Sequence, residues 1–187
     1  MKNYKATTPS RRHMTGIAYR DVLTRAKPEK SLTRGFKRDM GRNSDGRITV
    51  RHKGGGAKRS YREVDFKYDK KDIPGRIQSV EYDPNRSGFI SLVVYPDGAK
   101  RYTLLPSGLK KNDKIITSTT ADLKVGNRLP LEKISVGTFI YNIEAQPGSG
   151  AKLVRSAGSF AELLAHDGGY SLIKMPSMEV RKISKNA

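Results

Sequence analysis

The chain has 187 residues, a formal net charge of +19 and no cysteine. The lack of cysteine excludes disulfides and thiolate metal ligands, and no apolar run approaches the ~20 residues of a membrane-spanning helix. So large a charge opposes compaction unless a partner neutralises it, and it therefore indicates a polyanionic ligand. The N-terminus is basic but lacks the apolar core of a signal peptide, so we expect no secretion.

Most of the excess positive charge lies in the first third of the chain. Residues 1–62 contain 18 Lys and Arg against 4 Asp and Glu, whereas the remaining residues contain 19 against 14. Residues 1–60 also have only short apolar pieces, separated by basic stretches and by stretches rich in Gly, Ser and Asn. We therefore predict a basic and mostly irregular extension over residues 1–60 that becomes ordered on its partner.

Short strands begin at Tyr61. YREVDFKY at 61–68 alternates apolar and polar side chains, as a half-buried strand does, and FISLVVY at 89–95 is apolar on both faces, as an interior barrel strand would be. The turn signals DPNRSG and PDG separate neighbouring strands, and we expect the first turn to project Arg86 from the rim of the barrel. LKKNDKIIT contributes another short strand. Strands spaced about ten residues apart predict a small antiparallel barrel over residues 61–125.

A second series of strands follows the polar connector TADLKVGNRLP. HDGG and MPSM each join two apolar segments as turns would, which predicts a second small barrel over residues 126–187. The segment FAELLAH has the composition of a short helix, since Ala, Glu and Leu are good helix formers. We favour a strand there because the segment lies between two turns at strand spacing.

Catalytic and metal chemistry have little support in the sequence. His13, His52 and His166 are far apart, without the spacing of a zinc ligand set, and there is no GxSxG nucleophile motif. GGGAKRS resembles a phosphate-binding loop but is not a Walker motif, because Lys58 does not directly follow a glycine. We expect a protein that is not an enzyme and needs no cofactor, with structural Mg²⁺ or K⁺ accompanying any bound RNA.

The segment RITVRHKGGGAKRSYR at 47–62 places basic residues on both sides of three glycines and contains no acid. Arg matches phosphate oxygens bidentately, and glycine lets backbone N–H groups approach phosphates directly. This pattern favours nucleic acid over a membrane surface or an acidic protein, and the absence of a recognition-helix pattern favours RNA over DNA. Tyr61, Tyr102 and His52 lie among the basic residues and are candidates for stacking on bases, with core packing as the alternative for the tyrosines.

Ten motifs occur in order between Tyr4 and Ile183: TTPSRRHMT, KPEKSL, GRITVRHKGGGAKR, EYDPNRS, KRYTLLPSGLK, LKVGN, LPL, VGT, YNIE and LVRSAG. Together they resemble the bacterial-type ribosomal protein L2 family of the large subunit. The resemblance implies an all-β chain with an extension that threads rRNA (1–60), an OB-fold (61–125) and an SH3-like barrel (126–187). It also implies a structural, primary binder of large-subunit rRNA near the peptidyl-transferase region, which supports subunit association and tRNA binding in translation.

The same resemblance implies other ribosomal proteins as partners, small-subunit rRNA at an intersubunit bridge, and a cytoplasmic rather than organellar ribosome. It transfers rRNA contacts to Arg86 in the DPNRS turn, to Arg155 in RSAG, and to the RRH, RHKGGG and KRY segments. With the other basic and glycine positions of the extension, the predicted rRNA-binding residues are Arg11, Arg12, His13, Arg42, Arg47, Arg51, His52, Lys53, Gly54, Gly55, Gly56, Lys58, Arg59, Arg62, Arg86, Arg101, Tyr102 and Arg155.

Three departures from the family pattern bear on function. The family continues into a C-terminal arm with a histidine proposed to assist peptidyl transfer, whereas this sequence ends at Ala187, so no catalytic residue is transferred. Met178 stands where the family has a turn glycine and would be strained if that turn needs a positive φ. Ala57 replaces a histidine after the glycines. Two alternatives stay open: a single-strand nucleic-acid-binding protein acting off the ribosome, and a direct contributor to peptide-bond formation through His13 or His52.

Overall fold

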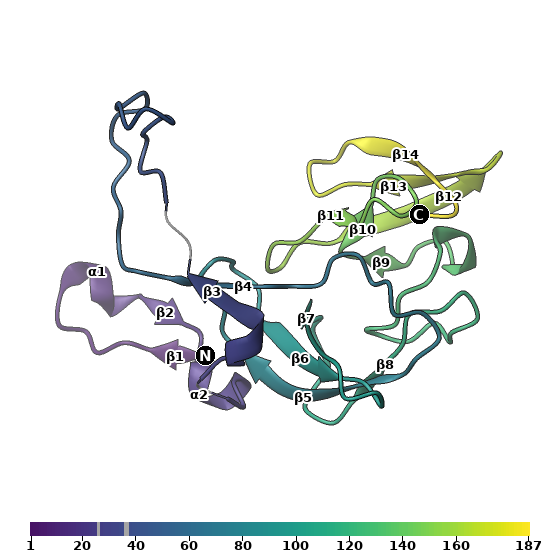
Figure 1. The fold of residues 1–187 in the computed structure, drawn as a ribbon, viewed down its shortest axis with the longest axis horizontal. Coiled ribbons are helices and arrows are strands. Elements are labelled where there is room, and N and C mark those ends of the chain that lie inside the picture. Colours follow the sequence, from purple (N-terminus) through teal and green to yellow (C-terminus); the bar gives the residue numbers. More distant parts are fainter. Residues whose placement is uncertain (26, 36–37) are drawn as a thin grey trace.

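Strands dominate the computed structural model, which describes residues 1–25, 27–35 and 38–187. The described strands form two four-stranded antiparallel sheets and three two-stranded ribbons, and the helices are single turns (Figure 1). The all-β prediction is therefore confirmed. Within the described ranges, no helix is both long enough and apolar enough to cross a membrane.

The helical turns are α1 (Pro9–Arg12), α2 (Tyr19–Val22), η1 (Lys30–Leu32) and η2 (Leu131–Lys133). The strands are β1 (Lys2–Asn3), β2 (Thr15–Gly16), β3 (Thr33–Gly35), β4 (Ser60–Arg62), β5 (Gly75–Glu81), β6 (Ile90–Val94), β7 (Lys100–Leu104), β8 (Lys114–Ile115), β9 (Phe139–Ile140), β10 (Ile143–Glu144), β11 (Ala151–Leu153), β12 (Ala161–Asp167), β13 (Tyr170–Lys174) and β14 (Val180–Ser184).

The first sheet has the strand order β7-β6-β5-β8, and β6 is its central element. Leu92 and Val93 are adjacent on β6, point to opposite faces, and are both fully buried. Leu92 belongs to an apolar cluster with Tyr102, while Val93 belongs to a second cluster with Ile77. The prediction that β6 is buried on both faces is therefore confirmed.

The second sheet has the order β14-β13-β12-β9, and its core contains Leu131, Leu163 and Ile173. The segment FAELLAH is the strand β12, as predicted, because pairing with β13 and β9 overrides its helical propensity. The HDGG turn between β12 and β13 has positive φ at both Gly168 and Gly169. Two successive positive φ values are those of a type I′ turn, whose twist matches the flanking strands.

The predicted strand over residues 61–68 is too long. Pairing stops at Arg62 in β4, and Val64 makes only an isolated bridge to Tyr102. The Asp65 carboxylate accepts hydrogen bonds from the backbone N–H groups of Lys67 and Tyr68, at 2.9 and 3.0 Å. This side-chain turn competes with strand pairing, so the chain leaves the sheet here and runs toward the second one.

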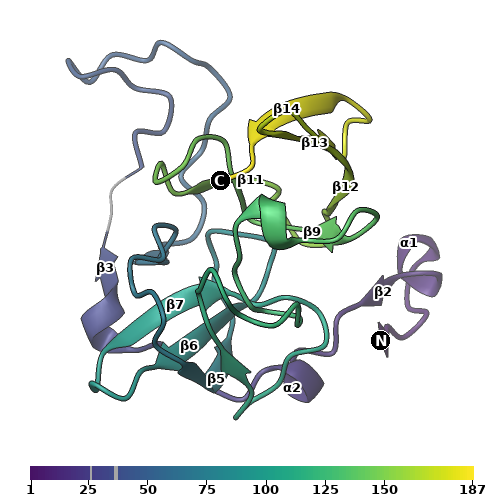
Figure 2. The same ribbon diagram turned by 90° about the vertical axis from the view of Figure 1, so that its right-hand side faces the viewer.

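Figures 1 and 2 show where the predicted extension lies relative to the two sheets. Its first residues form the small ribbon of β1 and β2, with α1 in the connecting loop. Strand β3 pairs with β4, and Leu32 packs against the cluster of Leu92 on the first sheet. Residues 38–59 form a long loop that projects away from both sheets in the two views.

The turn between β13 and β14 contains the unusual Met178, which has a φ of +68°. The N–H of Met178 donates to the Met175 carbonyl, and the N–H of Met175 donates to the Glu179 carbonyl. A tight turn followed by a residue in the left-handed region usually has glycine at that position. The turn does have a positive φ at Met178, which is the condition under which the sequence indicates strain at this position.

We predict that Met178→Gly raises the free energy of unfolding by about 0.5–1 kcal/mol. The substitution removes roughly 1–2 kcal/mol of strain from the left-handed backbone at residue 178. The greater conformational entropy of glycine in the unfolded chain offsets part of this gain. The Met178 side chain is 72% exposed, so little packing is lost. Urea denaturation measures the change, and Ser177→Gly, at the preceding position with an ordinary φ, is the control that should not stabilise. An equal or lower unfolding midpoint for Met178→Gly would contradict the strain.

Candidate nucleic-acid interface

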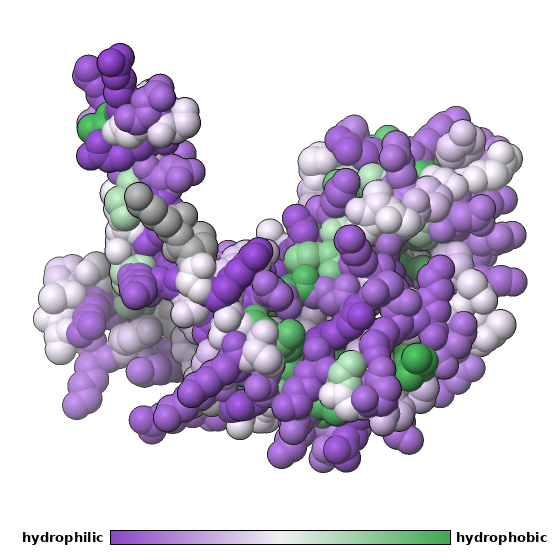
Figure 3. Space-filling view, viewed as in Figure 1, coloured by the Kyte–Doolittle hydropathy of each residue, from purple (hydrophilic) through white to green (hydrophobic). Residues whose placement is uncertain are grey.

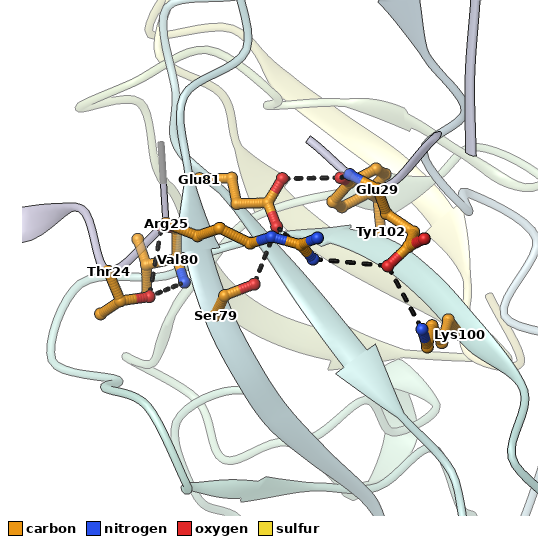
Figure 4. Close-up of polar contacts among 8 residues, drawn as sticks. All are labelled: Thr24, Arg25, Glu29, Ser79, Val80, Glu81, Lys100 and Tyr102. Atoms are coloured by element: carbon orange, nitrogen blue, oxygen red, sulfur yellow. Dashed lines mark hydrogen bonds and ion pairs between the residues drawn. The ribbon is translucent and has the colours of Figure 1, made fainter. Parts of the chain in front are cut away.

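The extension is anchored to the first sheet by a cluster of polar contacts (Figure 4). The N–H of Thr24 donates to the Val80 carbonyl, at 3.1 Å, and the Val80 N–H donates to Thr24 Oγ1, at 2.7 Å. The Glu29 N–H donates to the Tyr102 hydroxyl, at 2.8 Å, and that hydroxyl donates to Glu81 Oε2, at 2.6 Å. Two points of the extension are thereby fixed to β5 and β7.

The carboxylates of this anchor are held by cations on both sides. Glu81 is buried, and the Arg25 guanidinium lies 3.8 Å from its carboxylate. The Ser79 hydroxyl donates a hydrogen bond to the same carboxylate, at 2.8 Å. Glu29 pairs with Lys100, at 3.2 Å, and with Arg25, at 3.4 Å. The hydrogen bond from Lys100 is the main cause that lowers the pKa of Glu29.

Tyr102 belongs to the core and not to an RNA-facing surface. Its side chain is 0% exposed and packs with Leu92 and Leu104. Burial and the hydrogen bond to Glu81 both raise its pKa, so the hydroxyl stays protonated and donates to that carboxylate. A ring enclosed in this way cannot stack on a base, so the predicted RNA contact at Tyr102 is wrong.

The projecting loop carries a tight turn near its tip. Gly41 has a φ of +76°, and its carbonyl accepts from the N–H groups of Thr49 and Val50. A Cβ added at Gly41 would lie 2.2 Å from the Val50 carbonyl oxygen, so only glycine allows this closure. Arg42 closes the same turn by donating to the Gly46 carbonyl, at 2.8 Å. The loop is thus locally ordered, although hydrophilic residues cover most of it (Figure 3).

Most predicted contact residues of the extension have unpaired cationic groups. Arg11 and Arg12 lie on α1, with His13 at its C-cap. The remaining ones lie on the projecting loop between Arg42 and Arg59. Within the described ranges, no hydrogen bond or ion pair engages the side-chain cations of Arg11, Arg12, Arg47, Arg51, Lys53, Lys58 and Arg59. Repulsion among these charges is therefore not relieved by acids of the protein itself.

The three glycines of the loop also leave hydrogen-bond donors unused. No backbone N–H of Gly54, Gly55 or Gly56 has an acceptor among the residues that the structure describes. His52, two residues earlier, is exposed and has a φ of +61°. Free amides beside free cations are the donors that bind phosphate oxygens.

The predicted contact residues on β4 and β7 instead have partners within the protein. Arg101 on β7 forms ion pairs with Asp65, at 2.5 Å, and with Asp69. The hydrogen bond from Arg101 is the main cause that lowers the pKa of Asp69. Arg62 is buried on β4, and its Nη1 donates to the Ser60 carbonyl, at 2.7 Å. These cations hold the fold around them and contribute less free charge than the sequence suggests.

Arg86 was expected to project from its turn, and the structure places it against the protein. Its Nε donates to the buried Asp83 carboxylate, at 2.6 Å, and only 17% of its side chain is exposed. Its guanidinium carbon also lies 5.6 Å from the centre of the Phe66 ring. The expected projection is therefore wrong, because an acid three residues earlier holds the side chain.

Phe66 contacts both Arg86 and Arg155, the two arginines for which the family resemblance implies rRNA contacts. Arg155, which follows β11, has its guanidinium carbon 4.4 Å from the same ring centre. The contact joins the two sheets, since the Ala157 N–H donates to Ser87 Oγ, at 3.1 Å, and the Ala151 N–H donates to the Phe66 carbonyl, at 2.8 Å. Cation–π attraction to the ring offsets some of the repulsion between the two guanidinium groups.

Several residues at this junction have left-handed backbones. Tyr68, Asn142 and Val154 have φ values of +54°, +56° and +54°, and Val154 directly precedes Arg155. The Asn142 N–H donates to the Val154 carbonyl, at 2.8 Å, while its side-chain amide donates to the Tyr68 hydroxyl, at 2.7 Å. A positive φ is a genuine outlier for a β-branched residue, and such strain is concentrated at functional sites.

Sequence analysis missed Phe66, Asp83 and the strained Val154 as determinants of this surface. The only local signal was the acid at Asp83, three positions before Arg86 in the turn. The histidines add no metal site. The ring nitrogens of His166 are within hydrogen-bond distance of Ser171 Oγ and the Ile134 carbonyl. In the described part of the chain, no group of three or more His, Cys, Asp or Glu residues is arranged to hold a metal ion.

Two small β-sheet domains carrying a loop of unpaired cations and free amides define a class of protein that binds a polyanionic nucleic acid. Comparison with family models agrees. Residues 29–117 match the model described as "Ribosomal Proteins L2, RNA binding N-terminal domain", and residues 124–187 match "Ribosomal Proteins L2, C-terminal domain".

The chain belongs to the ribosomal protein L2 family, as the resemblance predicted, and is a large-subunit ribosomal protein that binds RNA. Its two domains are the OB-fold and the SH3-like barrel of that family, which is a family of structural RNA-binding proteins. The N-terminal match begins at Glu29, inside the anchor described above.

We predict that the stabilisation provided by Glu29 is lost in acid. Because the pKa of Glu29 is lowered below its ordinary value of 4.5, the Lys100 contact contributes above that value and disappears as the pH falls through the folded-state pKa. Glu29→Gln should therefore lower the free energy of unfolding at pH 7 by about 1 kcal/mol or less. That difference should begin to shrink as the pH falls below 4.5, and it should vanish once the pH is below the folded-state pKa.

Urea denaturation between pH 3 and pH 8 measures this difference. Glu132→Gln is the matched control, because Glu132 is exposed and its carboxylate has no ion pair in the described part of the chain. A difference for Glu29→Gln that is the same at every pH would show that the lost contact is not ionic.

Proposed function

We propose that this protein is a primary binder of large-subunit rRNA near the peptidyl-transferase region, where it supports subunit association and tRNA binding. The observation that carries the proposal is the projecting loop, with unpaired cations and free glycine amides on an anchored base. Neutralising these charges with phosphates releases the counterions condensed on the RNA, which supplies most of the affinity. The two barrels provide rigid surfaces that set where the loop enters the RNA.

The proposed contacts are of two kinds. Free cations and amides bind phosphates directly, and they are Arg11, Arg12, Arg47, Arg51, Lys53, Gly54, Gly55, Gly56, Lys58 and Arg59. Beside them, His13 and His52 contribute ring N–H donors, and Arg42 contributes the guanidinium donors that its bond to Gly46 leaves free. Arg86 and Arg155 bind as a pair that Phe66 positions. Arg62 and Arg101, whose cations are already engaged, shape the surface and touch RNA with the donors that remain free.

The surroundings of the protein follow from the same proposal. Its partners are rRNA, neighbouring ribosomal proteins, and small-subunit rRNA at an intersubunit bridge, in a cytoplasmic rather than organellar ribosome. We propose a division into an rRNA-threading extension over 1–60, an OB-fold over 61–125 and an SH3-like barrel over 126–187. Any Mg²⁺ or K⁺ required belongs to the RNA, and none of the residues above is assigned a catalytic role.

Sedimentation of native extracts tests the proposed function. The protein should sediment with large ribosomal subunits and stay there in moderate salt. A protein that migrates instead with free mRNA or single-stranded DNA, and is absent from large subunits, would be the single-strand binder acting off the ribosome. Subunits assembled with His13→Ala or His52→Ala should form peptide bonds at the normal rate, and a loss of chemistry without loss of assembly would assign a catalytic role.

We predict that Arg155→Ala weakens rRNA binding and reduces the slope of log K against log salt by up to about 0.9, the value for one lost phosphate contact. Arg86→Ala should weaken binding with a smaller change of slope, because Asp83 already compensates part of the Arg86 charge. Filter binding to an rRNA fragment at several salt concentrations measures both.

Arg181→Ala is the control for these two substitutions, because Arg181 is an exposed, ion-paired arginine on β14. It removes the same formal charge from a site with no proposed contact, so its slope should match that of the unmodified protein. Equal slopes for all four proteins would argue against direct phosphate contact at Arg155.

A further inference from the structure

A cationic cavity lies where the projecting loop leaves the ribbon of β3 and β4. It has a volume of about 490 Å³ and is lined by Arg34, Gly35, Arg38, Arg59, Tyr61 and Asn85. Sites that hold small organic ligands are roughly 300–1,000 Å³ in volume, so this one is large enough for more than a single phosphate. Its lining combines residues of β3, β4, the loop and the DPNRS turn.

The three arginines differ in how firmly they are held. The Nε of Arg34 forms an ion pair with Glu63, at 3.3 Å, and the guanidinium carbon of Arg34 lies 5.2 Å from the centre of the Tyr61 ring. The guanidinium of Arg38 donates a hydrogen bond to the Ala57 carbonyl, at 2.8 Å. Arg59 has no side-chain hydrogen bond or ion pair among the described residues. The cavity therefore has two positioned guanidinium groups and one that is available for a phosphate.

The side-chain carbonyl oxygen of Asn85 is a hydrogen-bond acceptor, for which a phosphate group alone offers no donor. Its side-chain amide donates to the Ser60 carbonyl, at 2.7 Å, which orients the amide and leaves its carbonyl oxygen to accept a hydrogen bond. The exocyclic amino group of a base is a donor of the required kind. Guanidinium planes, such as that of Arg34, are surfaces on which unpaired bases stack.

We propose that this cavity binds one unpaired nucleotide extruded from the rRNA, with its phosphate on Arg59 and its base against Arg34. The proposal rests on the proposed function and specifies the ligand at one point of the interface. A bound nucleotide at this position would lie at the base of the projecting loop, next to its phosphate-binding groups. A nucleotide held in the cavity fixes the register of the RNA relative to the loop.

The first test uses the isolated full-length protein and three probes: AMP, CMP and inorganic phosphate. Each is titrated at constant ionic strength while the Nε–Hε NMR signals of Arg34, Arg38 and Arg59 are followed. The nucleotides should shift these signals saturably and at least about tenfold more tightly than phosphate, because the base adds stacking and a hydrogen bond. Equal affinities for phosphate and nucleotides would overturn the proposal.

Two variants make the assignment specific to the cavity. Arg59→Gln should weaken nucleotide binding by about tenfold, as expected for the loss of one charge-assisted hydrogen bond. Arg181→Gln removes one charge from the second sheet and should leave nucleotide binding unchanged. Equal losses for both variants would mean that the nucleotides respond to net charge alone, and the cavity would not be their site.

The second test uses an rRNA fragment and chemical probing of its unpaired bases. Wild-type protein should protect one unpaired base that Arg59→Gln leaves reactive, while the remaining footprint is the same for both proteins. A normal footprint without such a base would overturn the cavity proposal and leave the proposed function intact. A protein that takes up AMP or CMP in the cavity but gives no rRNA footprint would instead overturn the proposed function, with free nucleotides as the ligand.

Discussion

Positive charge that the chain cannot neutralise by itself is the constraint on which the rest of this structure depends. On the two sheets, arginines have acids close by, such as Asp83 beside Arg86 and Asp65 beside Arg101. On the projecting loop, the cations of Arg51 and Lys53 have no such partner in the described part of the protein. Mutual repulsion opposes packing of this loop against the equally basic body, and an external polyanion relieves it.

The anchor between the extension and the first sheet fixes where the projecting loop begins. Tyr102 and Glu81 are buried, and hydrogen bonds within a low-dielectric interior are stronger than those exposed to water. By fixing the Glu29 backbone to β7, they give the loop a defined starting point. An RNA that binds the loop therefore orders a chain whose base is already in place, and less entropy is lost on binding than for a free tail.

Sequence alone predicted the features that depend on local turn chemistry. The HDGG hairpin and the strand at FAELLAH follow from residues within one turn of each other. At Met178 the family pattern indicated only that strain would result if the turn had a positive φ. Partners that are distant in the chain were not predictable in this way. Asp65 lies 36 positions from Arg101, and Glu81 lies 21 positions from Tyr102. A local pattern gives the charge of a side chain, whereas its availability depends on what the fold places beside it.

The junction at Phe66 shows why availability matters for recognition. Arg86 and Arg155 come from different domains, and neither domain alone presents both guanidinium groups. Three features position them: the Phe66 ring that both contact, the hydrogen bond from Ala157 to Ser87, and the strained backbone at Val154. A rigid pair of cations matches one arrangement of phosphates and repels others, because each guanidinium loses little entropy on binding. Under the proposed function, the relative position of the two barrels therefore favours folded RNA over an extended strand.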